Sequence, residues 1–206
     1  MEIGVLGPLL VVGNDGKPVV QRSALQRVLL ASLLAGRGRI LEPDELMECL
    51  WSDALPADPT AALQSQMSRL RRQLGSASLW IETVRPGYRM VCPHNRLDAQ
   101  RAERLFAEAR RVDGHPAVAL ERLDRALALW RGRSFQGLAD LPAIAAEAVR
   151  LEELRGEVGE LRAEVLLELG RPADAASSMQ VAIVEYPYPS DALLRPGHRT
   201  RPPGWG

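Results

Sequence analysis

The spacing of apolar residues changes near Pro93–Asp98, and this change divides the chain into two kinds of structure. Before this point, short segments of strand-like period alternate with segments of helical period. From Asp98 to Tyr186, apolar residues recur at helical spacing, and glycine and proline separate the segments. The sequence therefore predicts an α+β domain over residues 1–97 and an all-α domain over residues 98–186.

The first 97 residues are expected to form short strands, three helices and a β-hairpin. The strands fall in the first twenty residues, around a turn at residues 13–16 and ending with Val19-Val20. Proline at the first turn of the second helix and glycine after the third are typical helix boundaries. The expected elements are helices from Ser23 to Gly36, Pro43 to Trp51 and Thr60 to Leu74, and a hairpin from Trp80 to Val91 that turns at Pro86-Gly87.

The helical half repeats a pattern of small and apolar residues. Helices are expected over Ala99–Val112, Ala117–Trp130, Ala143–Leu169 and Ala173–Tyr186. The pattern is typical of the second helix of a tetratricopeptide repeat, where small residues let helices stack closely. An amphipathic helix with an alanine-rich seam is the alternative explanation. The two copies are Ala119, Leu123, Ala126 and Leu127, and Ala175, Met179, Ala182 and Ile183.

The last segment, residues 187–206, has a different composition. It contains five prolines and no apolar period. Such a segment buries too little apolar surface to offset the entropy lost on ordering, so it is predicted to be a disordered tail.

The helix Thr60–Leu74 has one apolar and one polar face. At about 100° per residue, its four apolar residues Leu63, Met67, Leu70 and Leu74 fall on one side. The opposite side carries hydroxyl, amide and guanidinium groups, which can form hydrogen bonds with adenine and guanine edges or with phosphates. A solvated arginine face is the alternative. The candidate DNA contacts on this helix are Thr60, Gln64, Ser65, Gln66, Ser68, Arg69, Arg71 and Arg72.

The hairpin that follows adds basic and aromatic residues near its turn: Thr83, Arg85, Tyr88 and Arg89. A helix preceded by another helix and followed by a basic hairpin is the arrangement of a winged helix. In that fold the helix enters the major groove and the hairpin, or wing, meets the adjacent backbone or minor groove. The sequence thus predicts a winged helix-turn-helix domain that binds double-stranded DNA.

Composition limits the other possibilities. Residues 1–97 carry 11 Lys or Arg against 9 Asp or Glu, whereas residues 98–186 carry 12 against 16, which is compatible with DNA binding by the front half alone. The longest apolar run, Val28–Ala35, is too short to span a membrane. The two cysteines form no disulfide framework. We therefore expect a cytoplasmic protein that does not engage membranes.

Catalytic and metal-binding patterns are not apparent. The three histidines, at positions 94, 115 and 198, lack partners at metal-ligand spacing. No Ser-His-Asp order, P-loop or GxGxxG phosphate loop occurs. We expect no metal, no cofactor and no enzymatic activity.

Several motifs together resemble a known family. Residues 62–74 and 83–89 look like the recognition helix and wing of OmpR/PhoB-type proteins, whose wing often has one more glycine where Pro86 stands here. Further motifs are similar to those of the Streptomyces antibiotic regulatory protein (SARP) family, which joins that winged helix to a "bacterial transcriptional activator" domain of repeat-like helices. They are Leu6-Gly-Pro-Leu9, Asp44-Glu-Leu46 with Leu50-Trp51, Leu129-Trp-Arg-Gly132 and Glu152-Glu-Leu-Arg155.

The resemblance implies an activator of secondary-metabolite genes that binds direct repeats near promoters, as a homodimer on tandem sites, and contacts RNA polymerase. It implies a polymerase contact at the loop 52–59, with Asp53 and Asp58 as candidates. The family's helical domain normally continues for at least one more helical pair, so an incomplete domain is expected here. Two alternatives remain: a DNA-binding protein that does not activate, and an interaction scaffold built on the repeat-like helices.

Overall fold

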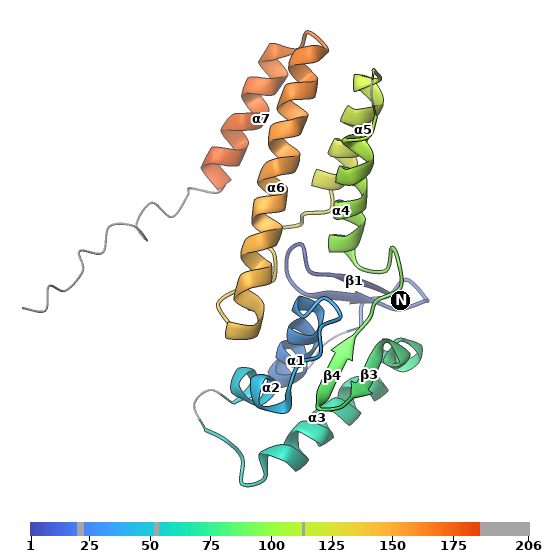
Figure 1. Cartoon of the computed structure of the whole chain (residues 1–206), viewed down its shortest axis with the longest axis vertical. Helices are drawn as coiled ribbons and strands as arrows, with labels where there is room; N and C mark the ends of the chain where they lie inside the picture. Colours follow the sequence, from blue (N-terminus) through green and yellow to red (C-terminus); the bar gives the residue numbers. More distant parts are fainter. Residues whose placement is uncertain (20–22, 52–53, 113, 186–206) are drawn as a thin grey trace, which may run out of the picture.

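The computed structural model describes residues 1–19, 23–51, 54–112 and 114–185, with side chains through Ser178 (Figure 1). The front half contains β1 Glu2–Gly4, β2 Leu10–Val12, α1 Ala24–Ala35, α2 Pro43–Leu50, α3 Pro59–Leu74, the 3₁₀ helix η1 Gly75–Trp80, β3 Ile81–Val84 and β4 Gly87–Met90. The back half contains α4 Asp98–Ala109, α5 Pro116–Leu127, α6 Pro142–Glu168 and α7 Pro172–Glu185. In the described part of the chain, no helix is long and apolar enough to cross a bilayer.

The front half is a winged helix, as predicted. Helices α1, α2 and α3 pack around a common core, and the β3–β4 hairpin lies beside α3 (Figure 1). Leu41 joins the hairpin by exchanging two backbone hydrogen bonds with Tyr88, of 2.8 and 3.0 Å. The contact requires glycine at position 87, because a Cβ there would lie 1.9 Å from the carbonyl oxygen of Leu41. The wing is thereby attached to the segment that precedes α2.

Two local expectations differ from the structure. The segment after α3 forms η1 before the hairpin begins at Ile81, so the strand starts one residue later than predicted. Pro18 forms a single bridge with Val12 in place of the expected strand at Val19-Val20, and Val20 lies outside the described residues.

The back half is all-α, and each helix packs against the next from α4 to α7 (Figure 1). Ala119, Leu123 and Ala126 are buried between helices, as the repeat-like pattern predicts. Ala175 is also buried. The side chains of the second copy beyond it and the tail 187–206 lie outside the described residues, so those expectations stay predictions.

A buried carboxylate joins the two halves at Asp98, the first residue of α4. Its Oδ1 accepts the N–H of Val5 at 2.8 Å, its Oδ2 accepts the N–H of Leu6 at 3.1 Å, and Arg131 lies 3.2 Å from Oδ2. Burial raises the pKa of Asp98 above its usual value, although these hydrogen bonds and the Arg131 charge oppose the shift. Arg131 also donates to the carbonyl of Pro8 at 3.0 Å. The segment after β1 is thus held by both α4 and the α5–α6 loop.

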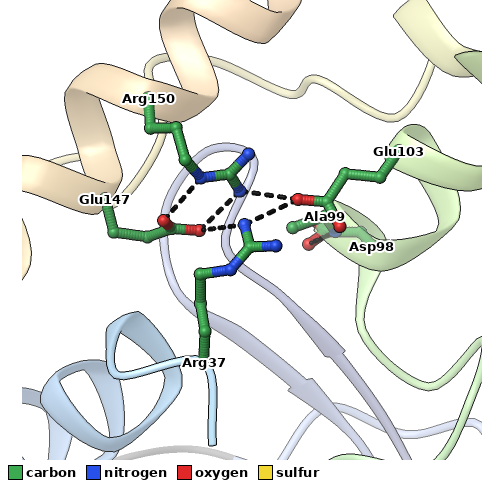
Figure 2. Close-up of polar contacts among 6 residues, drawn as sticks. All are labelled: Arg37, Asp98, Ala99, Glu103, Glu147 and Arg150. Atoms are coloured by element: carbon green, nitrogen blue, oxygen red, sulfur yellow. Dashed lines mark hydrogen bonds and ion pairs between the residues drawn. The ribbon is translucent and has the colours of Figure 1, made fainter. Parts of the chain in front are cut away.

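A second junction is an ion network between α1, α4 and α6 (Figure 2). Arg37, just after α1, lies 2.7 Å from Glu103 of α4 and 3.3 Å from Glu147 of α6. Arg150 reaches the same two carboxylates, each at 2.7 Å. The Glu147 side chain is only 10% exposed. Its charge therefore depends on these two arginines for compensation.

We expect Arg150→Ala to lower the free energy of unfolding by about 1–3 kcal/mol, because it leaves the buried Glu147 carboxylate with fewer charged donors. The matched control is Arg125→Ala on α5, whose partner Glu121 is 62% exposed; its effect should stay near 0.5 kcal/mol or less. Urea unfolding of the two variants measures both values. Equal losses would show that the network adds no more than a surface ion pair.

Candidate nucleic-acid interface

Helix α3 presents a single polar face because its opposite face is wholly buried. The Asp58 side chain caps the helix by accepting the N–H of Ala61 at 2.9 Å, and Pro59 occupies the first turn. The four apolar residues of the predicted stripe are at most 2% exposed: Leu63, Met67, Leu70 and Leu74. The predicted inward stripe is confirmed, and no other residue of α3 is fully buried.

The outward face carries most of the residues predicted to contact DNA. Its exposed members are Thr60, Gln64, Ser65, Ser68, Arg69 and Arg72. Gln66 and Arg71 are half-buried at the sides of this face. The face combines hydroxyl, amide and guanidinium groups over the length of a helix that can enter a major groove. Whether these groups contact DNA stays a prediction.

Of the five arginines predicted to contact DNA, three have no side-chain partner among the described residues. Arg69 and Arg72 lie on the outward face of α3, and Arg85 lies exposed at the tip of the wing between β3 and β4. A guanidinium group without an intramolecular carboxylate keeps its full charge and its five donors for an external acceptor. These three residues are the strongest candidates for contacts with phosphates or guanine edges.

Arg71, also a predicted DNA contact, is engaged within the protein. Its Nη2 donates to the carbonyl oxygen of Ile81 at 3.1 Å and to Oγ1 of Thr83 at 2.8 Å. Its guanidinium carbon lies 5.9 Å from the centre of the Tyr88 ring. The structure therefore brings Arg71, Thr83 and Tyr88 together where α3 meets the wing. Sequence spacing alone did not reveal this contact.

Arg89, the second basic residue of the wing, is paired across the hairpin. Its guanidinium lies 2.6 Å from Glu82, the residue opposite it in the β3–β4 register. The two charges cancel, so the pair is neutral as a unit. Both side chains are partly exposed to solvent. The predicted turn at Pro86-Gly87 was wrong by one residue: Arg85 and Pro86 form the turn, and only this register places residues 82 and 89 opposite each other.

Of the two candidate polymerase contacts, only Asp58 belongs to the described residues. Asp58 serves as the N-cap of α3, and Asp53 lies outside the described residues. Near Asp58 the surface forms an open hollow of about 490 Å³, which the sequence analysis did not predict. Its lining is apolar with two carboxylates at the edge: Asp44, Met47, Glu48, Trp51, Ala54, Leu55 and Pro59.

Two protein families match the chain in the order that the fold shows. The family described as "Transcriptional regulatory protein, C terminal" matches residues 16–90, which contain all three helices of the winged helix and the whole β3–β4 wing. The family described as "Bacterial transcriptional activator domain" matches residues 97–194, which contain α4 to α7.

Similarity to curated relatives extends across both parts. The regulatory protein DnrI of Streptomyces peucetius is 30% identical over 198 residues, which cover 91% of this chain and 72% of DnrI. The chain belongs to the SARP family. EmbR of Mycobacterium tuberculosis, a transcriptional regulatory protein, is 30% identical over 194 residues, which cover 91% of this chain and 50% of EmbR. This SARP-family chain thus spans about half the length of EmbR.

A solved structure has the same fold. The structure of Mycobacterium tuberculosis EmbR in complex with a low-affinity phosphopeptide matches with a TM-score of 0.81 and 29% identity. The match covers 91% of this chain and 51% of EmbR. The arrangement of a winged helix followed by packed helices in this SARP-family chain is therefore shared with EmbR.

We expect Arg69→Ala and Arg72→Ala to weaken DNA binding with little loss of stability, because both side chains are exposed and unpaired. Loss of a phosphate contact lowers the slope of log affinity against log salt by about one, whereas loss of a guanine contact relaxes preference at one base pair. Titration of each variant against a selected DNA site at several salt concentrations distinguishes a phosphate contact from a guanine contact. Unchanged DNA affinity in both variants would show that α3 is not the helix that contacts the base edges.

For the wing, we expect Arg85→Ala to weaken binding to specific and random DNA by similar factors, because a wing mostly meets the sugar-phosphate backbone or minor-groove shape. The matched control is Arg125→Ala on α5, which also removes one exposed arginine but lies outside the proposed DNA-binding unit. It should leave the salt slope unaltered. A loss confined to the specific site would mean that Arg85 reads bases.

Proposed function

We propose that this chain is a sequence-specific DNA-binding transcriptional activator of a secondary-metabolite, or antibiotic, gene cluster. The observation that carries the proposal is the group of three unpaired arginines, Arg69, Arg72 and Arg85, on α3 and the adjacent wing. Membership of the SARP family supports the same function. The proposed DNA-binding unit is residues 1–97, and the proposed activator unit is residues 98–186.

In the proposed complex, α3 lies in the major groove with its outward face toward the base edges. Gln64 and Gln66 carry amides that match the donor and acceptor of adenine, and Arg69 and Arg72 match guanine or phosphate. Thr60, Ser65 and Ser68 are small enough to let the helix approach closely. Arg85 reaches the backbone or minor groove beside the site, so the wing adds affinity and α3 adds most of the specificity.

Activation requires a contact with RNA polymerase as well as with DNA. The hollow beside α2 and Pro59 supports such a contact, because an apolar surface with Asp44 and Glu48 at its edge suits a partner segment with basic and apolar side chains. We place the polymerase contact here, near Asp58. Two copies would bind tandem direct repeats near a promoter, in the bacterial cytoplasm, and the activity needs no cofactor or catalytic step.

The proposal is tested by selecting bound sequences from random oligonucleotides and measuring affinity at several salt concentrations. We expect enrichment of direct repeats and binding to them at least about 10³-fold tighter than to random DNA. The affinity for both should fall steeply with salt, because arginines release counterions from the phosphates. Absence of salt-dependent binding would favour an interaction scaffold instead.

In-vitro transcription from a promoter with the selected site tests activation separately. We expect RNA polymerase to produce more transcript when the protein is present. Binding without added transcript would identify the chain as a competitor for sites that other SARP-family proteins activate.

A further inference from the structure

We propose that Arg71 acts as a positioning residue that sets the angle of the wing relative to the recognition helix α3, rather than as a DNA contact. This inference rests on the proposed DNA-binding function. Arg71 lies between Arg69 and Arg72 in the sequence, but its side chain is half-buried at the side of the outward face and contacts the hairpin.

The contacts of Arg71 reach both strands of the wing. On β3, its Nη2 donates to the Ile81 carbonyl at 3.1 Å and to the Thr83 hydroxyl at 2.8 Å. On β4, its guanidinium carbon lies 5.9 Å from the Tyr88 ring centre, within the range of a cation–π contact. One planar group thus bridges the helix, a backbone carbonyl, a side-chain hydroxyl and an aromatic ring.

This bridge restrains the end of the wing that is nearest α3. The opposite strand is restrained separately, because Tyr88 exchanges two backbone hydrogen bonds with Leu41. Arg85 sits at the free tip, two residues beyond Thr83, without a partner among the described residues. A change in the angle of the hairpin is largest at this tip, so the position of Arg85 depends on how Thr83 and Tyr88 are held.

The contrast with its neighbours supports the assignment. Arg69 and Arg72 are exposed and unpaired, whereas Arg71 is half-buried and its Nη2 has two acceptors. Moving that group to a phosphate would leave the Ile81 carbonyl and the Thr83 hydroxyl without this donor. A lost hydrogen bond of this kind opposes the gain from a new phosphate contact.

A double-mutant cycle tests the proposal on the full chain with a selected DNA site. In the unmodified protein, Arg85→Ala should weaken binding roughly 10–100-fold, the ordinary effect of losing one charge-assisted contact. In an Arg71→Ala background the same change should cost less than about two-fold, because the wing tip no longer reaches its phosphate. The matched control is an Arg69→Ala background, where Arg85→Ala should keep its full effect.

The salt dependence adds a readout that a general loss of stability does not move. We expect the Arg71→Ala/Arg85→Ala protein to have the same salt slope as Arg85→Ala alone, since Arg71 neutralises no phosphate of its own. A further fall of about one in the slope, with additive losses in the cycle, would show that Arg71 contacts DNA directly and would overturn the proposal.

Thermal unfolding of each variant precedes the binding measurements. Where Arg71→Ala lowers the folded fraction, Arg71→Lys takes its place, because it keeps the charge but loses the planar fork that joins Ile81, Thr83 and Tyr88. Arg85→Ala should again lose part of its effect in this background. If the unmodified protein shows no salt-dependent DNA binding, the proposed function fails; if it binds and the cycle is additive, only the role of Arg71 fails.

Discussion

The apolar stripe of α3 is the constraint on which the candidate interface depends. Burying a large apolar side chain contributes roughly 1.5–3 kcal/mol, and α3 buries four of them between the other helices and the hairpin. A rotation of the helix that buried Arg69 would expose part of this stripe and desolvate an unpaired charge. The core therefore fixes which residues of α3 face outward, and the polar face is a consequence of packing.

The wing contributes Ile81 and Met90 to the same apolar core as α3, and polar contacts restrain it further. Arg71 ties β3 to α3, and the backbone of Leu41 ties β4 to the segment before α2. The polar contacts of Arg71 are separate from this apolar packing, so we expect a change at Arg71 to leave the core folded. This separation is what allows a single side chain to influence wing geometry.

The two halves of the chain are joined by charges that would be costly to separate. Asp98 accepts hydrogen bonds from the N–H groups of Val5 and Leu6. The segment directly after β1 therefore depends on the first turn of α4 for these hydrogen bonds. Glu147 of α6 is nearly buried and depends on Arg37, which follows α1 (Figure 2). Through these contacts the winged helix and the repeat-like helices support each other, although their sequences follow different periods.

The sequence by itself determined the order of the helices, the position of the hairpin and the inward stripe of α3, because hydrophobic period, proline and glycine act over a few residues along the chain. It also placed the candidate DNA residues on one helix face and one turn. Only the tertiary structure separated Arg71 from Arg69 and Arg72, since its acceptors Ile81 and Thr83 become neighbours only when the hairpin folds against α3. The hollow beside Pro59 and the Asp98 junction were equally inaccessible to sequence, because both depend on contacts between segments that are distant along the chain or brought together by packing.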